Sequence, residues 1–401
     1  MRVFADLHLH SRFSLATSPR MGLAELARAA GKKGLGLLGT GDCTHPEWLA
    51  EVRRQLRPVG DGVYGLGDAR FLVTGEASVV WRDETKGRRV HLLLLAPSIP
   101  AAERISTVLG RFGRTDSGGR PCLAAPVRDV VDAVWAAAPE TVVIPAHVWT
   151  PWYSALGARS GYDSLDACFG PYLEKIAAVE TGLSSDPAMC RKVAALDRLA
   201  LVSFSDAHSP DRLGREATAF DVDEISFPAI ASALAGAPGS TRTIELFPEE
   251  GKYYYDGHRA CGVSLAPAEA RAAGGRCPRC GKPLTMGVLH RIDDLSDRAS
   301  PVGVPDFDSI LPLGEVMAHI LGLRADSRTV AVAVESLVAR FGSELTILLD
   351  RPIGELQEAA PNGVAEAIAA VRAGRVARVP GYDGVYGRVA PDVQMPRTEP
   401  R

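Results

Sequence analysis

The sequence predicts an α/β fold in three parts: a β/α barrel-like domain, a small zinc-binding module and a C-terminal helical domain. In the first 208 residues, short apolar segments alternate with helical stretches, and the apolar segments stop at a His, Asp or Glu. Two pairs of potential zinc ligands follow, with fifteen residues between the pairs. The rest of the chain has helical spacing and no further metal motif.

The first domain is expected to alternate strands with helices. Helical spacing at 23–33 and 187–199 predicts two of the connecting helices. Because strand ends converge on one face of a β/α barrel, the polar residues that follow the strands should meet there. The strands are expected at 2–5, 35–38, 71–74, 142–146, 177–179 and 201–204.

The polar residues at the strand ends predict a metal centre with more than one ion. His8 and His10 are alternate residues of a strand, so their side chains point the same way and one metal can take both. A single His is about as often a satisfied core residue as a ligand. A whole series of unpaired buried imidazoles and carboxylates would be costly, however, so the series favours metal binding. Its members are His8, His10, Asp42, His45, Glu76, His91, His147, Glu180, Asp206 and His208.

A second metal motif begins at His258. His258 and Cys261 form one ligand pair, and Cys277 and Cys280 form the other in a Cys-Pro-x-Cys-Gly turn. This arrangement fits a closed tetrahedral zinc site with a structural role. The upstream half leaves open whether His258 or Asp256 is the fourth ligand, and the alternative is a reduced cysteine cluster in a loop.

Basic and aromatic residues surround this second motif. Lys252 precedes three tyrosines, and Arg279, His290 and Arg291 follow. Such a mixture suits contact with phosphates together with stacking on a base, although a lone basic loop is usually only solvated. These residues are therefore candidates for binding a nucleic acid.

The composition sets broad limits on the function. The 401 residues are 46% apolar and 23% charged, which suits two or three globular domains. A net charge of −3 gives no overall basic character, so any contact with nucleic acid must be local. The chain enters its first expected strand directly, without a signal or membrane-spanning segment, and its seven cysteines are not arranged as a disulfide scaffold. We therefore expect a cytoplasmic protein without a membrane partner.

The chain divides into four expected parts. The barrel is expected at 1–248, the zinc module at 249–299 and the helical domain at 300–388. The tail at 389–401 is Pro-rich and polar, which predicts disorder. Near the end of the helical domain, the Gly/Tyr segment 380–387 is a candidate for a turn that faces the substrate, although such a sequence is more often a hairpin with surface tyrosines.

The ordered ligand series resembles the polymerase-and-histidinol-phosphatase (PHP) family, which comprises metal-dependent phosphoesterases. The His-x-His start, the central Glu and the Asp-x-His end match the family's motifs in order. Family members commonly have Asp and His adjacent in the second motif, whereas Asp42 and His45 are separated by two residues, which leaves the role of His45 open. The resemblance implies a distorted (β/α)7-type PHP barrel in which Glu76 bridges two metals. It assigns one metal to His8, His10, Glu76 and Asp206, a second to Glu76, His91 and His147, and a third metal or substrate contacts to His45 and His208.

The zinc module extends this resemblance to one branch of the family, endonuclease Q, over essentially the whole chain. The segments that carry it are 5–14, 39–42, 180–186, 205–209 and the zinc motif continuing to 291. The resemblance implies a nucleoid-associated DNA-repair endonuclease that nicks on the 5′ side of deoxyuridine, deoxyinosine, deoxyxanthosine or an abasic site in duplex or single-stranded DNA. It implies two or three divalent metals (Zn, Mn or Mg) in the barrel and one structural zinc. The tail carries no Gln-led motif ending in paired aromatics, so no sliding-clamp partner is expected.

A mechanism follows for these residues. Two metals bridged by Glu76 would lower the pKa of a bound water and clamp the phosphate, while Asp206, Asp42 or Glu180 would hold or deprotonate the water. Arg12 and Arg215 are expected to neutralise the phosphate.

A damaged base would have to leave the duplex to be inspected. Trp149, Trp152 and Tyr153, which follow His147, are the candidate walls of its pocket, with aromatic packing on the barrel top as the equal alternative. Two other functions stay open: a small-molecule phosphatase of the histidinol-phosphatase type, and a non-catalytic zinc-dependent DNA-binding protein. The zinc module argues against the first, and the complete ligand series argues against the second.

Overall fold

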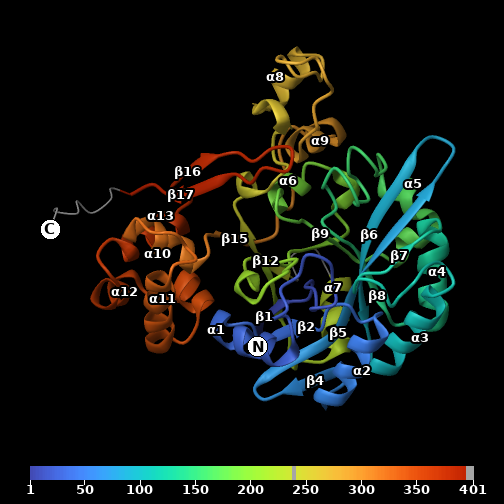
Figure 1. The fold of residues 1–401 in the computed structure, drawn as a ribbon, viewed down its shortest axis with the longest axis horizontal. Helices are drawn as coiled ribbons and strands as arrows, with labels where there is room; N and C mark the ends of the chain where they lie inside the picture. Colours follow the sequence, from blue (N-terminus) through green and yellow to red (C-terminus); the bar gives the residue numbers. More distant parts are fainter. Residues whose placement is uncertain (237–240, 394–401) are drawn as a thin grey trace.

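The computed structural model describes residues 1–236 and 241–393, and it has three parts (Figure 1). A barrel fills the right of the view, the zinc module projects from its top, and the C-terminal helices gather at the left. The barrel strands are β1 (Arg2–Asp6), β2 (Leu37–Gly39), β3 (Arg57–Gly60), β4 (Val63–Leu66), β5 (Ala69–Arg82), β6 (Gly87–Ala96), β7 (Cys122–Leu123), β8 (Val142–Pro145), β9 (Ala178–Glu180), β10 (Ala200–Val202), β11 (Ala217–Asp221) and β12 (Thr241–Leu246). Its helices are α1 (Leu23–Lys33), α2 (Pro46–Gln55), α3 (Ile99–Leu109), α4 (Val127–Ala137), α5 (Leu165–Phe169), α6 (Pro187–Cys190) and α7 (Phe227–Ala235).

The other two parts are smaller. The zinc module contains β13 (Asp256–His258), β14 (Val263–Leu265), α8 (Pro267–Ala272) and α9 (Val288–Leu295). The C-terminal part contains β15 (Phe307–Ile310), α10 (Leu313–Leu321), α11 (Arg328–Phe341), α12 (Ile353–Ala359), α13 (Val364–Arg372), β16 (Val376–Val379) and β17 (Arg388–Pro391).

The barrel is a mixed sheet, as the predicted α/β class requires. Its strands follow the order β15-β12-β11-β1-β2-β5-β4-β3, and β6 continues the sheet from β5 to β8. The pair β9 and β10 completes the ring, because β8 contacts β9 and β10 contacts β12. β1, β2 and β5 run parallel, so their carboxyl ends reach the same edge.

Alternation along the strands separates two apolar layers. On β6, Leu92 and Leu94 face the helices that surround the barrel, whereas Leu93 and Leu95 belong to the cluster inside it. α7 contributes Phe227 and other apolar residues to the inner cluster. The barrel interior is therefore filled by side chains, and the polar residues at the strand ends are left at its rim.

The helix predicted at 23–33 is confirmed as α1. Leu23, Leu26 and Ala30 recur at helical spacing and are buried. The helix ends at Gly34, which has a φ of 89° and donates its N–H to the carbonyl of Ala30.

Two other local predictions are wrong. The segment 187–199 forms only α6 and a 3-10 turn at Ala194–Leu196, because the buried guanidinium of Arg191 binds the carbonyls of Leu196 and Leu199 and curls the chain around itself. The strand expected to stop before Glu76 continues to Arg82, since β5 pairs along most of its length with β6.

The C-terminal part differs from a purely helical domain. β15 pairs with β12 and so extends the barrel sheet beyond the expected boundary at residue 300. β16 and β17 form an antiparallel hairpin, which confirms the turn expected at 380–387. The expectation of disorder is wrong for the start of the tail, because residues 389–391 belong to β17. Backbone pairing between β17 and β16 orders these residues despite the Pro-rich composition of the tail. The remainder of the expected disordered tail, 394–401, lies outside the described residues.

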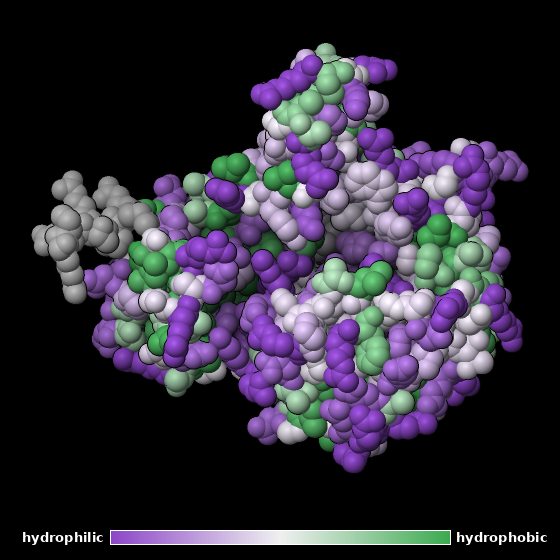
Figure 2. All heavy atoms as spheres, in the orientation of Figure 1, coloured by the Kyte–Doolittle hydropathy of each residue, from purple (hydrophilic) through white to green (hydrophobic). Residues whose placement is uncertain are grey.

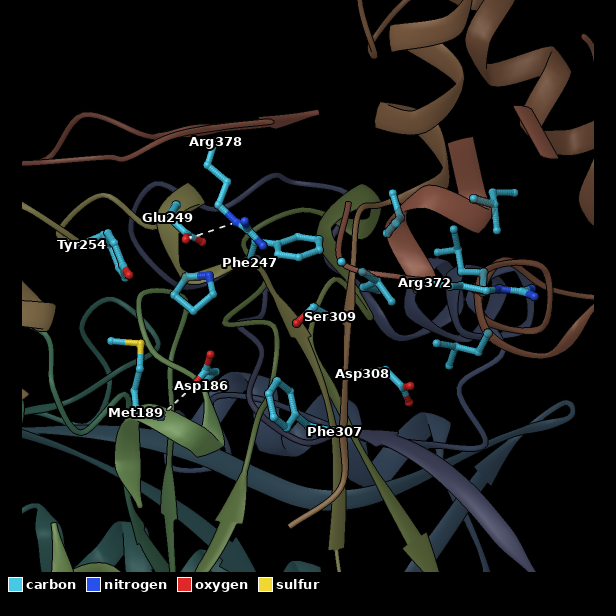
Figure 3. A pocket seen from close by; sticks show the side chains of 17 residues that line it. Asp186, Met189, Phe247, Glu249, Tyr254, Phe307, Asp308, Ser309, Arg372 and Arg378 are labelled. Carbon is cyan, nitrogen blue, oxygen red and sulfur yellow. Dashed lines mark hydrogen bonds and ion pairs between the residues drawn. The ribbon is translucent and has the colours of Figure 1, made fainter. Parts of the chain in front are cut away.

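The C-terminal part meets the barrel across a pocket of about 520 Å³ (Figure 3). Arg378 of β16 forms an ion pair of 3.2 Å with Glu249 and lies over the ring of Phe247. On the other side, Asp308 of β15 accepts two hydrogen bonds from Arg242 of β12. These contacts fix the C-terminal helices against the barrel. None of the described helices is both long and apolar enough to cross a membrane.

Candidate metal centre

The first candidate metal group lies directly after β1. Leu9 forms a parallel bridge with Ala207, and this extended backbone directs the side chains of His8 and His10 to the same side. Their Nε2 atoms lie 3.6 Å and 3.4 Å from Oε2 of Glu76. One potential ligand atom from each of the three residues falls within 4.8 Å of the others.

The second candidate group uses the other oxygen of Glu76. Oε1 of Glu76 lies 2.5 Å from Nδ1 of His91 and 3.2 Å from Nε2 of His147. Glu76 and His91 share one face of the β5–β6 hairpin, because Glu76 lies opposite Leu93 in the register and His91 lies two residues before Leu93. Glu76 thus presents one oxygen to each group, which is the geometry of a bridging carboxylate.

A third group forms on the open side. Oδ1 of Asp206 lies 3.0 Å from Nε2 of His10 and 3.7 Å from Nδ1 of His208. Burial alone would raise the pKa of Asp206. The hydrogen bond from His10 and the charge of His8 have a larger, opposite effect, and they hold this pKa well below its usual range. Glu76 behaves alike: burial opposes its ionisation, yet His91 and Arg120 keep its pKa well below the ordinary value. Both carboxylates are therefore ionised at neutral pH, as metal ligands must be.

Two further carboxylates lie behind the imidazoles rather than among the groups. Asp42 lies 3.2 Å from Nδ1 of His10 and accepts a hydrogen bond from the backbone of Ser11. Glu180 lies 2.9 Å from Nδ1 of His8 and accepts a hydrogen bond from the backbone N–H of His147. A carboxylate on Nδ1 fixes the ring and leaves Nε2 free for a cation. The structure thus places the carboxylates of Asp42 and Glu180 against the Nδ1 atoms of His10 and His8.

The donor set fits divalent metal ions. Nε2 of His8 is buried without a hydrogen-bond partner, although a buried polar atom normally has one. It points toward the carboxylates of Glu76 and Asp206, at 3.6 Å and 3.8 Å. Imidazole nitrogens and carboxylate oxygens together suit zinc, iron or manganese.

The backbone at the centre is strained. Asp42, His147 and Asp206 have φ values of 45°, 31° and 46°, in the region that non-glycine residues rarely adopt. Such residues concentrate at functional sites, where the surrounding structure holds them in place. Position 182 must also be a glycine, because the backbone there packs directly against His147. A Cβ at Gly182 would lie 2.6 Å from the Cβ of His147.

Four members of the metal groups, His91, His147, Asp206 and His208, line a cleft of about 990 Å³. Figure 2 shows the hollow in this face, below the projecting zinc module. Basic and aromatic side chains line the cleft. They are Arg89, Arg120, Arg212, Arg215, Lys252, Trp152, Tyr153, Tyr253 and Tyr386.

The zinc motif of the sequence is also assembled. Ligand atoms of His258, Cys261, Cys277 and Cys280 lie within 4.8 Å of one another. Burial raises the pKa of Cys277, but backbone N–H groups of Arg279 and Cys280 lower it to about 7, which favours a thiolate. Asp256, the alternative fourth ligand, is instead engaged with His290 and the backbone of Gly287.

Comparisons with known proteins point to one family. The chain has a TM-score of 0.87 and 32% identity to the crystal structure of the lesion-specific endonuclease PfuEndoQ from Pyrococcus furiosus, covering 99% of this chain and 96% of that one. This chain belongs to the endonuclease Q family. A second structure, endonuclease Q in complex with a 27-mer duplex substrate that has an abasic lesion at the active site, gives a TM-score of 0.88 at 32% identity, over 99% of this chain and 97% of that one.

The sequence relatives of this endonuclease Q chain are uncharacterised proteins. YqxK of Bacillus subtilis is 27% identical over 97% of this chain and 100% of its own length. MJ0043 of Methanocaldococcus jannaschii is 32% identical over 60% of this chain, and the match spans only 31% of that protein. A family model described as the MJ0043 C-terminal domain matches residues 312–375, which covers the helices α10 to α13.

The endonuclease Q cleft includes an arginine that the sequence did not single out. Nη1 of Arg120 lies 2.6 Å from Oε2 of Glu76. Arg120 follows Gly118 and Gly119 in a loop, and a Cβ at Gly119 would lie 2.6 Å from Oδ2 of Asp42. The only available signal was this Gly-Gly-Arg sequence, which allows a loop to approach the centre closely.

Three residues predicted for the site lie elsewhere. Trp149 is 1% exposed and donates its indole N–H to Cys190, so it belongs to the core. Arg12 pairs with Glu51 instead of facing the cleft. His45 caps α2 by accepting a hydrogen bond from the backbone of Trp48, and the described structure does not bring it into any of the metal groups. Arg215, Trp152 and Tyr153, in contrast, line the cleft, and their roles there stay predictions.

The candidate DNA contacts of the zinc module mainly stabilise the structure. His290 is buried and lies 2.6 Å from Asp256. Arg291 donates to the carbonyls of Leu156 and Tyr162, which ties the module to the barrel. Arg279 is exposed and braces the zinc motif by donating to the carbonyl of Cys261.

A buried carboxyl behind the centre predicts pH-dependent stability. Burial raises the pKa of Glu216 to about 8, while Ser203 donates a hydrogen bond to it. An acid whose pKa is higher in the folded state than in the unfolded state destabilises the fold as pH rises from the unfolded-state pKa toward the folded-state pKa. The penalty stops growing about one pH unit above the folded-state pKa. Glu216→Gln should therefore raise Tm relative to the wild type at pH 8.5, by about 2 °C or more, and not at pH 4.5. Thermal unfolding at both pH values measures this, with exposed Glu335→Gln as the control. An equal gain at both pH values would contradict the assignment.

Proposed function

We propose that this chain is a metal-dependent DNA-repair endonuclease that hydrolyses the phosphodiester on the 5′ side of a deaminated base or an abasic site. The observation that carries the proposal is the pair of metal groups that share Glu76, next to a large cleft with basic and aromatic walls that His91 and His147 of the second group line. Basic groups suit the phosphates, and aromatic rings suit unstacked bases. A small-molecule phosphatase needs neither so large a cleft nor a zinc module.

The metal ligands follow from the groups. His8, His10, Glu76 and Asp206 would hold one ion, and Glu76, His91 and His147 a second, with His208 available to a third. Zinc, manganese or magnesium at these positions would supply Lewis-acid activation of the water and of the scissile phosphate. His258, Cys261, Cys277 and Cys280 would hold one structural zinc.

The chain's own residues prepare the reaction. Asp42 and Glu180 hold His10 and His8 in the tautomer that leaves Nε2 unprotonated. Arg120 and Arg215 line the cleft and would neutralise the phosphate. Water attacks phosphorus, the bond from phosphorus to the 3′ oxygen breaks, and that oxygen takes a proton. The products are a 3′-hydroxyl and a 5′-phosphate.

The direct test uses labelled duplexes and single strands that carry one deoxyuridine, hypoxanthine or abasic site, with an undamaged control. Each is incubated with the protein and Mg²⁺, Mn²⁺ or Zn²⁺. We expect one nick on the 5′ side of the lesion and none in the control. Equal cleavage of the undamaged strand, or no cleavage of any damaged one, would refute the proposal.

Trp152 is proposed as a wall of the pocket for the extruded base. Its ring lines the cleft in edge contact with Tyr253, at 5.7 Å. Loss of a stacking ring costs about 1 to 3 kcal/mol per base. Trp152→Ala should therefore slow cleavage at deoxyuridine by roughly fivefold to 150-fold, and cleavage at an abasic site, which has no base to stack, much less.

The ratio of deoxyuridine to abasic cleavage measures this effect. Trp81→Ala serves as a control, because Trp81 is a partly exposed ring that stacks on Tyr162 and does not line the cleft. If Trp152 only packs against the barrel, both substrates slow alike and the ratio stays at its wild-type value.

A further inference from the structure

The loop after β1 carries an apolar side chain into solvent at the rim of the cleft. Leu15 is 80% exposed, more than any other large apolar residue that the structure describes. The next residue, Ala16, lines the cleft, as does Ser18. Single exposed apolar residues are ordinary on protein surfaces, so the position of Leu15 beside the metal centre is what distinguishes it.

The loop is held firmly on both sides of Leu15. Before it, the hydroxyl of Ser14 donates to the carboxylate of Asp42. After it, the backbone N–H of Ser18 donates to the carbonyl of His208 at 2.8 Å. Both anchors belong to the walls of the metal centre. The exposure of Leu15 is therefore a fixed feature of the loop.

The backbone conformation of the loop also places Leu15 at its exposed tip. Ala16 has a φ of 59°, so the chain turns sharply immediately after Leu15. Beside the tip lies Gly118, in the loop that carries Arg120, and a Cβ at Gly118 would lie 3.5 Å from Cγ of Leu15. Two loops that both reach the metal centre thus support the exposed side chain.

We propose that Leu15 inserts into the base stack of duplex DNA and fills the space left by the lesion nucleotide when that nucleotide turns into the cleft. The inference rests on the proposed function and names a residue that prepares its substrate. Extrusion leaves an apolar gap between neighbouring base pairs, and proteins that kink or unstack duplexes insert Leu, Ile, Met or Phe into such gaps. Leu15 acts on the paired duplex alone, because an unpaired nucleotide leaves no stacked position to fill.

The test compares one labelled deoxyuridine strand in two forms: paired in a duplex, and unpaired within a bubble of three nucleotides. Leu15→Ser should slow cleavage of the paired form about tenfold or more and leave the bubble within twofold of the wild type. The matched control is Leu323→Ser, which removes an exposed leucine (45% exposed) from the C-terminal part, away from the cleft. It should leave both rates unchanged. Equal slowing on the two forms, or no slowing, would overturn the proposal.

A binding measurement separates failure of this inference from failure of the proposed function. A duplex with 2-aminopurine opposite the lesion, and with a linkage on the 5′ side of the lesion that cannot be hydrolysed, is titrated with the metal-loaded protein, so that no cleavage occurs. The wild type should raise the fluorescence as the stack opens, and Leu15→Ser should bind without that rise. An identical rise with both proteins overturns the role of Leu15 even if cleavage is confirmed. A rise confined to the wild type supports it even if the cleaved lesions differ from those proposed.

Discussion

Asp206→Ala is expected to reduce cleavage by roughly 10³-fold or more while the protein stays folded. Asp206 joins two of the His residues in one candidate metal group, and its carboxylate is ionised at neutral pH. Its side chain is one-third exposed to the cleft, so its removal leaves no cavity in the apolar core. The loss should therefore appear in metal content and in turnover, and little in the circular dichroism spectrum.

Asp211→Ala is the matched control. Asp211 lies five residues further along the chain, and its exposed carboxylate pairs with Arg20 at the surface. Its loss should change neither metal content nor rate. Glu76→Gln should be as damaging as Asp206→Ala, because both metal groups share Glu76. Near-normal turnover by Asp206→Ala protein with its full complement of metal would show that the centre is assigned incorrectly.

The metal centre could be predicted from the sequence because its ligands lie on local backbone with a regular period. His8 and His10 share a face of an extended segment, and Asp206 follows an apolar strand. The same reasoning could not tell a ligand from the group that orients it. Asp42 and Glu180 have the spacing of ligands, and only the fold reveals that their carboxylates meet the Nδ1 atoms of the imidazoles.

Tertiary contacts account for the other differences. Two tryptophans only three residues apart have different surroundings, because Trp149 is in the core while Trp152 lines the cleft. Helical periodicity fails where the buried Arg191 captures two carbonyl groups, because side-chain hydrogen bonds replace those of the helix. Arg120 reaches Glu76 from a glycine-rich loop whose path no periodic pattern describes.

The zinc module gives the second large effect. Cys277→Ser should release one zinc and unfold the part of the module between residues 258 and 284, while α9 stays packed on the main core and the barrel keeps its metals. The module's own apolar cluster contains only four buried residues, one of which is Cys277 itself. Structural zinc contributes about 10 to 16 kcal/mol in comparable small modules, far more than so small a core can supply. The barrel core is separate from this cluster, so its metal groups should survive.

Three measurements follow for Cys277→Ser, with Cys122→Ser as the control because Cys122 is an exposed cysteine of β7 outside the module. Metal analysis should show one zinc fewer per chain in Cys277→Ser alone. Trypsin should then cut the variant between Arg259 and Lys282, a segment that the folded module protects from the protease. Duplex binding by the variant should weaken. Two contacts connect the module to the cleft. Arg291 holds the module to the barrel, and the segment that carries Lys252 and Tyr253 of the cleft wall leads into the module's first strand, which begins at Asp256. Unchanged zinc content would mean that His258, Cys261 and Cys280 do not need Cys277, and hence that the four residues do not form one tetrahedral site.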